Sequence, residues 1–269
     1  MKPNTLKQKW AAGQPTLNGW LSIPNSFSAE VMAAQGFDSV TIDMQHGPIG
    51  YGDALVMLQA LAAYDVTPVV RVPWLDPAAI MTAMDAGAFA IICPMINNRE
   101  QAEQLVSYMR YPPDGTRSFG PTRVAYGVGG NYAAEANEQI MCLAMIETAE
   151  AMSNLQEIVS TPGLDGIYIG PADLSLGMSN GRLTPGMDRE EPEMVEAIQS
   201  ILKAARGAGV GACLHCGSPE YAAKAIGWGF NLCTLNSDAR FLEIAASASL
   251  KTARKLLSQS THGSSTGGY

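Results

Sequence analysis

The stretch PVVRVPWLDPAAIMTAMDAGAFAIICPM, residues 68–95, contains one complete strand–helix–strand unit. Its apolar ends, Pro68–Val72 and Ala90–Met95, are typical of strands that are buried on both faces. The amphipathic segment between them, Pro77–Ala86, indicates a helix. Gly87 follows this segment, as glycine often does at a helix end because it tolerates a left-handed backbone. Such a unit is the building block of a parallel sheet.

The same alternation continues along most of the chain. Six further apolar runs indicate strands: Leu17–Ile23, Ser39–Asp43, Met141–Glu147, Gly166–Gly170, Gly209–His215 and Asn231–Asn236. Amphipathic stretches separate them. Eight β–α units in about 250 residues predict a TIM (β/α)8 barrel, which we expect to form a single domain over residues 1–257. An open, doubly wound sheet is the main alternative, but the chain has no G-x-G-x-x-G motif after the first run, which weakens that alternative for a dinucleotide site.

The composition excludes several classes of function. Of the 269 residues, 47% are hydrophobic and 16% are charged, which allows a sizeable core. Acidic residues outnumber basic ones by 25 to 17 without a run of Lys or Arg, so we expect no nucleic-acid partner. No apolar stretch approaches the roughly 20 residues of a membrane span, and the amino terminus does not resemble a secretory signal. The five cysteines are expected to be free buried thiols in a cytoplasmic protein.

Three segments interrupt or end the repeating pattern. Arg110–Gln139, which holds several Pro and Gly residues, and Met178–Pro192 are expected to be long loops, and long ordered loops on a barrel are usually functional. The tail Ser258–Tyr269 is rich in Ser, Thr and Gly and is expected to be flexible unless another subunit holds it.

Two carboxylates lie where the barrel should carry its chemistry. In a TIM barrel, polar residues at the carboxyl ends of the strands are the catalytic candidates. Glu147 ends the fifth run and Asp173 follows the sixth, where an unpaired buried charge would be unfavourable. If they converge, they suit a hard divalent cation such as Mg²⁺ or Mn²⁺. The alternative is that Asp173 caps a helix and Glu147 pairs with an arginine.

Three more polar residues follow the second and third runs. Asp43 and His46 are three residues apart in a predicted turn, a spacing compatible with a contact in which the carboxylate fixes the tautomer of the imidazole. A capping Asp and a loop His are the alternative. Arg71 lies in an otherwise apolar run, and its planar guanidinium suits a carboxylate or a developing enolate. The alternative is a structural pair with Glu147 or Asp43. The segment Cys213–Cys216, CLHC, lacks the second ligand pair of a zinc site, so we expect core thiols there.

Taken together, these motifs resemble those of the HpcH/HpaI aldolase family. The resemblance runs from about Asn18 to about Asn236 and rests on Asp43-x-x-His46, Val70-Arg71-Val72-Pro73, Tyr111-Pro112-Pro113-x-Gly115-x-Arg117, Glu147-Thr148 and Ile169-Gly170-Pro171-Ala172-Asp173-Leu174-Ser175. The family consists of class II pyruvate aldolases on a TIM barrel, among them 4-hydroxy-2-oxoheptanedioate aldolase and 2-keto-3-deoxy sugar-acid aldolases. The resemblance implies an enzyme that cleaves or forms 4-hydroxy-2-oxo acids, giving pyruvate and an aldehyde through a metal-stabilised enolate.

The resemblance also implies roles for individual residues. Glu147 and Asp173 would hold Mg²⁺ or Mn²⁺, or else Co²⁺ or Zn²⁺, and the keto acid would chelate this metal. Arg71 would contact the keto oxygen and stabilise the enolate. Asp43 and His46 would form a dyad that works with metal-bound water to move the proton of the 4-hydroxyl. The residues expected to contact the substrate are Arg71, Met145, Gly170, Ala172, Asp173 and Leu214.

The resemblance also implies a subunit assembly, and the sequence differs from the family at one expected site position. The family is commonly a trimer of dimers with exchanged carboxyl-terminal helices, and Asp85 matches an acid that reaches the site of a neighbouring subunit. Met145 stands where the family usually has Gln, two residues before Glu147. Because positions two apart on a strand face the same way, Met145 should face the site and alter the contacts made to the substrate.

Other functions remain open. A lyase acting on citramalyl- or malyl-CoA thioesters would need a basic surface for the phosphates, and the sequence shows no such cluster. A non-catalytic barrel that binds a small keto acid would not depend on its metal carboxylates for any activity. A decarboxylase or a pyruvate-condensing synthase would share the enolate. A class I mechanism is not expected, because Lys7, Lys9, Lys203 and Lys224 do not lie at the carboxyl ends of predicted strands.

Overall fold

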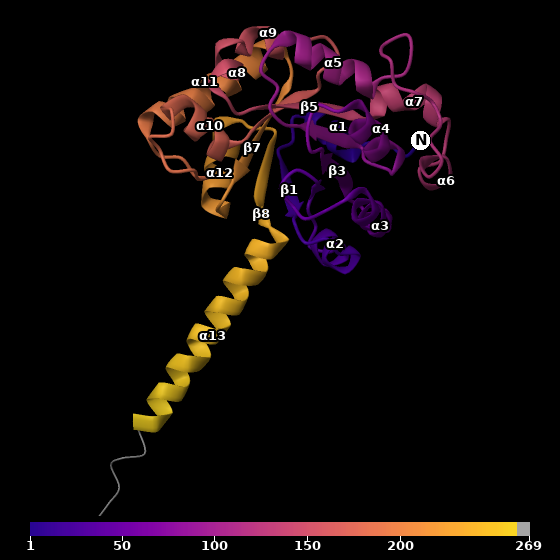
Figure 1. Cartoon of the computed structure of the whole chain (residues 1–269). Coiled ribbons are helices and arrows are strands. Elements are labelled where there is room, and N and C mark those ends of the chain that lie inside the picture. Colours follow the sequence, from indigo (N-terminus) through magenta and orange to yellow (C-terminus); the bar gives the residue numbers. More distant parts are fainter. Residues whose placement is uncertain (263–269) are drawn as a thin grey trace, which may run out of the picture.

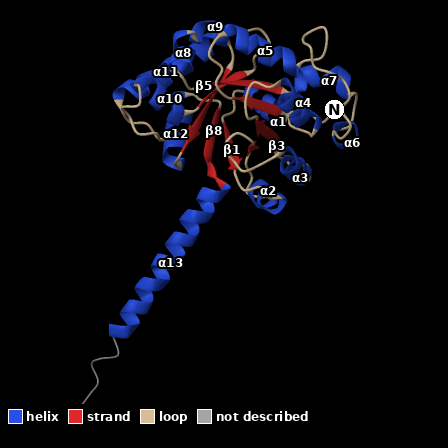
Figure 2. Ribbon diagram, viewed as in Figure 1, coloured by secondary structure: helices blue, strands red, loops and turns tan. Residues whose placement is uncertain are grey.

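The computed structural model describes residues 1–262 and confirms the predicted barrel. Eight parallel strands, β1 to β8, pair in chain order, and β8 pairs back with β1 to close the sheet. Figure 2 shows the strands at the centre with helices around them. The strands are Thr16–Leu21, Ser39–Asp43, Thr67–Arg71, Ala90–Cys93, Met141–Ile146, Gly166–Ile169, Gly211–Cys216 and Leu232–Ser237. Closure excludes the open doubly wound sheet.

Helices follow the strands, and most of them cover the outside of the barrel (Figure 1). They are α1 (Thr5–Ala11), α2 (Ser26–Ala33), α3 (Tyr51–Leu61), α4 (Pro77–Asp85), α5 (Arg99–Met109), α6 (Val124–Gly127), α7 (Tyr132–Gln139), α8 (Ala149–Ser153), α9 (Leu155–Val159), α10 (Pro171–Ser179), α11 (Pro192–Ala208), α12 (Pro219–Trp228) and α13 (Asp238–His262). No helix among residues 1–262 is long and apolar enough to cross a membrane. The five cysteines are buried and free, as predicted.

Side chains on the strands alternate between two apolar layers. Met145, Tyr168 and Cys213 belong to the layer inside the barrel. Their strand neighbours Ile169 and Leu214 belong to the layer between the sheet and the helices. This alternation has a period of two, so the residue at a strand end faces either the barrel mouth or the helices according to its parity.

Helix α1, which the sequence did not predict, packs against the barrel interior. Asn4 caps the helix by accepting a hydrogen bond from the backbone N–H of Lys7 at 3.2 Å. Leu6 is fully buried among the interior residues, and its backbone N–H donates to the Thr67 hydroxyl at the start of β3. Because Thr67 is the first residue of its strand, α1 closes the amino-terminal end of the barrel.

Three predicted segments need correction. Arg110–Gln139 is not one continuous loop, because α6 and α7 lie within it. Helix α10 extends past Met178 to Ser179, which shortens the second predicted loop. Helix α13 continues past Leu257 to His262, so the first residues of the predicted tail are helical, and residues 263–269 lie outside the described part. Figure 1 shows α13 leaving the barrel and projecting away from it.

Candidate active site

A cavity of about 760 Å³ opens at the carboxyl-terminal end of the barrel. It brings together most of the residues that the sequence predicted, from four different strands and the loops after them. Its predicted lining residues are Asp43, His46, Arg71, Met145, Glu147, Gly170, Ala172 and Asp173. Further lining residues are Trp20, Ser22, Gly47, Met187, Asp188, His215, Cys216, Gly217, Asn236, Ser237 and Arg240.

Glu147 follows the last residue of β5 and is almost fully buried. Its Oε1 accepts a hydrogen bond of 2.9 Å from the backbone N–H of Met95, a residue held in the left-handed region with a φ of 57°. Burial is the main cause that raises the pKa of Glu147 to about 7; the negative charge of Asp173 also raises it, while the hydrogen bond from Met95 and the charge of Arg71 lower it. Within residues 1–262 no arginine forms an ion pair with Glu147, so the alternative of a structural pair is not observed.

Asp173 lies in the first turn of α10, where it faces the same cavity. Its carboxylate accepts no hydrogen bond from the helix backbone in the described structure, so it does not act as a cap. Gly170, just before the helix, allows the close approach of Glu147. A Cβ atom at position 170 would lie 2.5 Å from Glu147 Oε2 and 3.0 Å from Met145 Cε. The absence of a side chain at Gly170 therefore makes room for the Glu147 carboxylate.

Glu147 and Asp173 fit a divalent cation. Two carboxylates near each other favour a cation between them, and the described chain provides no lysine or arginine that forms an ion pair with either. In residues 1–262, no group of three or more His, Cys, Asp and Glu side chains could hold a metal. The chain would thus supply two oxygen donors, as magnesium sites that keep water or substrate ligands commonly do.

Arg71 and Asp43 form a buried pair beside these carboxylates. The Nε and Nη2 atoms of Arg71 donate to the two Asp43 oxygens at 2.8 and 2.7 Å. The indole N–H of Trp20 donates to Asp43 at 3.2 Å, and its ring lies under the guanidinium, 4.8 Å from ring centre to Cζ. Burial alone would raise the pKa of Asp43, but Arg71 and the backbone N–H groups of Gln45 and His46 together hold it below its ordinary value. Arg71 is therefore both paired and part of the cavity wall.

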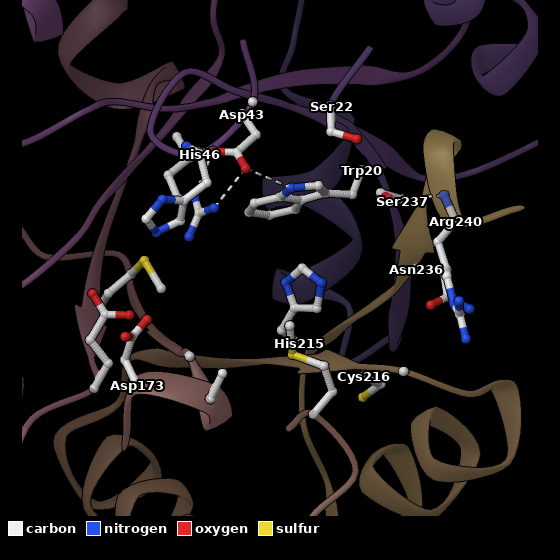
Figure 3. Close-up of a pocket in the computed structure, with 18 of the residues that line it drawn as sticks. Trp20, Ser22, Asp43, His46, Asp173, His215, Cys216, Asn236, Ser237 and Arg240 are labelled. Atoms are coloured by element: carbon white, nitrogen blue, oxygen red, sulfur yellow. Dashed lines mark hydrogen bonds and ion pairs between the residues drawn. The ribbon is translucent and has the colours of Figure 1, made fainter. Parts of the chain in front are cut away.

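The predicted contact between the His46 imidazole and Asp43 is not present in the described structure. Asp43 instead accepts a hydrogen bond from the backbone N–H of His46, at 3.3 Å. Arg71 and Trp20 occupy the carboxylate oxygens, which is the physical reason that the imidazole is not bound there. Its side chain is exposed at the cavity rim, on the side of Asp173 and opposite Arg240 (Figure 3).

His215, which was not predicted as a site residue, also lines the cavity, and its ring lies below Trp20 (Figure 3). Its Nδ1 is 3.0 Å from the Tyr168 hydroxyl, and its ring meets Trp20 edge-on with centroids 4.7 Å apart. Burial, and to a smaller extent the charge of Arg71, lower the pKa of His215 to about 3, against the opposite effect of Asp43. A signal was available, because His215 is two residues after the inward-facing Cys213 and so faces the barrel mouth.

Two predicted residues lie away from this cavity. The Leu214 side chain is fully buried on the outer side of β7, so the expected substrate contact by this side chain is wrong. Because side chains alternate along β7, the next residue, His215, faces the cavity instead. Asp85, at the end of α4, accepts a 2.6 Å hydrogen bond from Arg117, whose guanidinium stacks on Tyr111 and Tyr132. Its predicted reach into a neighbouring subunit remains a prediction.

Comparisons with known sequences find relatives over most of the chain. The family profile described as HpcH/HpaI aldolase/citrate lyase matches residues 18–240. A hydroxypyruvate/pyruvate aldolase from Rhizorhabdus wittichii is 42% identical over 253 residues, which cover 94% of this chain and all of the relative. A 4-hydroxy-2-oxo-heptane-1,7-dioate aldolase from Salmonella heidelberg is 39% identical over 77% of this chain and 78% of the relative.

Solved structures show the same likeness in three dimensions. An HpcH/HpaI aldolase/citrate lyase family protein from Burkholderia cenocepacia J2315 superposes with a TM-score of 0.86 at 31% identity, covering 93% of this chain and 99% of the other. The citrate synthase SbnG superposes with a TM-score of 0.83 at 31% identity, covering 94% and 98%.

Proposed function

The chain belongs to the HpcH/HpaI aldolase/citrate lyase family, and on this premise we propose that it is a divalent-metal-dependent pyruvate aldolase. It cleaves or forms 4-hydroxy-2-oxo acids, with pyruvate and an aldehyde as the other reactants. The observation that carries the proposal is the pair Glu147 and Asp173, which faces the same cavity as Arg71. Mg²⁺ or Mn²⁺ is the proposed metal, with Co²⁺ or Zn²⁺ as alternatives.

The first turn of α10 is suited to bind the substrate carboxylate. When bound at Glu147 and Asp173, a divalent metal would polarise the keto group as a Lewis acid. The backbone N–H groups of Ala172 and Asp173 have no carbonyl partner within the helix, because they belong to its first turn. They would donate to the carboxylate at the positive end of the helix, whereas Pro171 has no N–H to donate.

Arg71 is placed to stabilise the negative charge that develops on the keto oxygen. Asp43 fixes the guanidinium with two hydrogen bonds and Trp20 supports its face. The remaining nitrogen, Nη1, has no acceptor among residues 1–262 and Arg71 lines the cavity, so Nη1 can donate to the substrate. A fixed donor of this kind binds the enolate more strongly than the ketone, which lowers the barrier.

His46 is the proposed base that accepts the proton of the 4-hydroxyl group. During cleavage its exposed imidazole accepts the proton of the 4-hydroxyl, the bond between C3 and C4 breaks, and the aldehyde leaves. The electron pair of that bond forms the enolate, and C3 then takes up a proton to give the methyl group of pyruvate. Asp43 does not touch the imidazole but holds the His46 backbone through its N–H, so we assign it a positioning role.

The test follows the enolate without requiring the aldehyde. Protein, Mn²⁺ or Mg²⁺ and pyruvate are incubated in heavy water, and proton NMR follows the methyl group. We expect exchange of the methyl protons for deuterium, reversible loss of exchange with a chelator, and none in Glu147→Ala. Glu157→Ala, which removes an exposed carboxylate from α9, is the matched control and should exchange normally. Exchange without metal, or trapping of a pyruvate adduct by borohydride, would contradict the proposal.

A second candidate is a synthase that condenses a keto acid enolate with another carbonyl compound. The likeness to the citrate synthase SbnG, at 31% identity, supports this candidate only in that a carbon–carbon condensing enzyme shares this fold. Both candidates predict proton exchange, but only the aldolase releases pyruvate from a 4-hydroxy-2-oxo acid. A barrel that only binds the keto acid predicts no exchange, and a lyase of CoA thioesters predicts cleavage of such a thioester.

Assembly and location belong to the same proposal. We propose a homo-oligomer, a trimer of dimers that exchanges α13 between subunits, with Asp85 reaching the neighbouring site. The exposed leucines of α13 support this, because a helix that projects from the barrel with apolar side chains favours a partner. Small keto acids and aldehydes are the proposed partners, not nucleic acid, in keeping with the net charge of −8. A cytoplasmic location remains a prediction.

A further inference from the structure

His215 occupies a place in the cavity that the proposed chemistry leaves without a role. In the pairing of β6 with β7, Tyr168 lies opposite Cys213 and Ile169 opposite Leu214. His215 is the next residue of β7, and Gly170, which packs against Glu147, directly follows Ile169. The charges of Arg71 and Asp43 both affect the pKa of this imidazole, so both groups lie near it. A keto acid held between Glu147 and Arg71 would therefore lie beside His215.

A chain of hydrogen bonds inside the barrel leads toward this imidazole. The hydroxyls of Ser39 and Thr41 donate to the amide oxygen of Asn18, at 2.8 and 3.1 Å. The amide nitrogen of Asn18 then donates to the Thr234 hydroxyl at 2.9 Å. All four of these side chains are buried, so the direction of each donor is fixed by the small number of partners available.

The same chain fixes the tautomer of His215. Thr234 already accepts from Asn18, so its own hydrogen is available to the Tyr168 hydroxyl, 2.7 Å away. Tyr168 in turn donates to Nδ1 of His215, at 3.0 Å. In this direction every hydroxyl hydrogen has an acceptor, and the proton of the neutral imidazole lies on Nε2. That Nε2–H group has no acceptor among residues 1–262.

The Nε2–H of His215 is a neutral donor in a cavity whose other side-chain donors and acceptors are largely charged, among them Arg71, Asp43 and Glu147. Trp20 supplies an apolar surface against the ring. Burial and Arg71 keep the pKa of His215 low, so the ring stays uncharged over the ordinary range of pH. A neutral N–H suits a hydroxyl oxygen, whereas a charged imidazolium would compete with Arg71 for the carboxylate or the keto oxygen.

We propose that the Nε2–H of His215 binds a hydroxyl group on C3 of the keto acid, so that the enzyme prefers hydroxypyruvate to pyruvate as the enolate donor. The inference rests on the proposed aldolase function. The other oxygens of the substrate already have partners there: the carboxylate has the amides of α10, the keto oxygen has Arg71, and the 4-hydroxyl has His46. In synthesis, C3 loses a proton and bonds to the aldehyde carbon, and the aldehyde oxygen gains a proton, giving a 3,4-dihydroxy-2-oxo acid.

Exchange of the C3 protons in heavy water tests the donor preference without an aldehyde. The ratio of kcat/KM for hydroxypyruvate over pyruvate is measured in the wild type, His215→Leu and His215→Gln. We expect His215→Leu to lower this ratio about tenfold, which is the loss of one hydrogen bond. His215→Gln, which retains an N–H donor, should recover part of the ratio. Ile167→Val, a core change on the outer side of β6, is the control and should keep the wild-type ratio.

Binding of unreactive analogues provides a readout independent of turnover. Glycerate and lactate differ by the same C3 hydroxyl and cannot form the enolate. Calorimetry on the Mn²⁺-loaded protein should show tighter binding of glycerate in the wild type and about equal binding of the two in His215→Leu. Tyr168→Phe, which leaves His215 in place but removes the donor to Nδ1, should reduce the difference.

The outcomes separate the inference from the function on which it rests. If pyruvate exchanges normally but neither the ratio nor the glycerate preference depends on His215, the inference is overturned and the aldolase stands. If metal-dependent exchange fails with both donors, the proposed function is wrong. The glycerate measurement then still decides whether His215 binds the hydroxyl. If His215→Leu does not fold, the inference depends on His215→Gln and Tyr168→Phe, and unchanged preference in both overturns it.

Discussion

Arg71 shows how one residue can satisfy a structural and a chemical requirement at once. The sequence left two interpretations of this arginine, a structural pair or a contact with the substrate. The structure pairs it with Asp43 through two nitrogens while the residue still lines the cavity. The pair therefore stabilises a buried charge and also aims the guanidinium, because a planar fork held at one edge presents the other edge in a fixed direction.

Replacing Arg71 by lysine should separate binding from turnover. Lysine keeps the charge but cannot hold two bonds to Asp43 while donating to the keto oxygen. We expect kcat for pyruvate exchange to fall on the order of 100-fold, with a much smaller change in KM. Steady-state exchange rates measured by NMR check this. A variant with near-native kcat would mean that the arginine only stabilises the fold.

Glu147 should make metal binding depend on pH around neutrality. Its raised pKa of about 7 means that the folded, metal-free protein carries a neutral, protonated carboxyl below that pH. A metal must displace this proton, so affinity falls as the pH drops through 7 and levels off above it. Between pH 8 and pH 6 we expect Mn²⁺ affinity to weaken about tenfold, measured by calorimetry.

Proton release identifies Glu147 as the group responsible for that dependence. At pH 6 the binding enthalpy should vary between buffers of different ionisation enthalpy, and at pH 8 much less. Circular dichroism at both pH values confirms that the protein remains folded. Equal affinity at the two pH values would show that the carboxyl is already ionised at pH 6.

At the scale of strands and helices, the strands were predictable and several short helices were not. Continuous apolar runs are the direct consequence of burial on both faces, so each run indicated its strand. Helices α1, α6 and α7 are short and lie in polar or glycine-rich sequence, where packing against the barrel decides their conformation. The hydrophobic pattern of a short stretch of sequence contains little information about such packing.

The site was predictable as a set of strand-end residues but not as a set of contacts. The sequence placed Glu147 and Asp173 at one cavity because parallel strands all end at the same face. It could not show that Asp43 binds Arg71 and not the His46 imidazole, because spacing does not rank competing donors. His215 lies between cysteines in a segment typical of core thiols, and only its position two residues after the inward-facing Cys213 indicates that it faces the barrel mouth.

The junction of β6 and α10 provides a sharp test of the metal site. Gly170 has a φ of −96°, which alanine adopts without strain, so an added methyl group would act only through space. That methyl would lie 2.5 Å from Glu147 Oε2 and must displace the carboxylate. We expect Gly170→Ala to weaken Mn²⁺ binding at least about tenfold and to suppress pyruvate exchange while the protein still folds.

A second glycine provides the matched control for Gly170→Ala. Gly52 lies in α3, where an added Cβ meets no atom within 4 Å. Gly52→Ala should keep wild-type metal affinity and should stabilise the helix by about 0.5–1 kcal/mol. Calorimetry and thermal unfolding of both variants check the pair. Wild-type metal affinity in Gly170→Ala would mean that Glu147 can move aside and still bind.

At the scale of the whole molecule, the two ends of the chain behave differently. Helix α1 near the amino terminus closes the amino-terminal end of the barrel, whereas α13 projects away from the barrel (Figure 1). Along α13, Leu242, Leu250 and Leu256 fall within one side of the helix, given 100° per residue. Their side chains are 64%, 53% and 60% exposed, an apolar stripe that a partner surface would cover.

A charge in that stripe should therefore break the assembly. We expect the wild type to form a species several times the 28.5 kDa of one chain, and Leu250→Asp to dissociate it, because a carboxylate would be buried without a partner. Ala248→Asp adds the same charge at an exposed position about 160° around the helix from Leu250 and should leave the mass unchanged. Light scattering coupled to size-exclusion chromatography at micromolar concentration measures all three. If dissociation also lowers pyruvate exchange, a residue of the neighbouring subunit, such as Asp85, completes the site. A wild type that elutes as a single chain would overturn the exchange of α13.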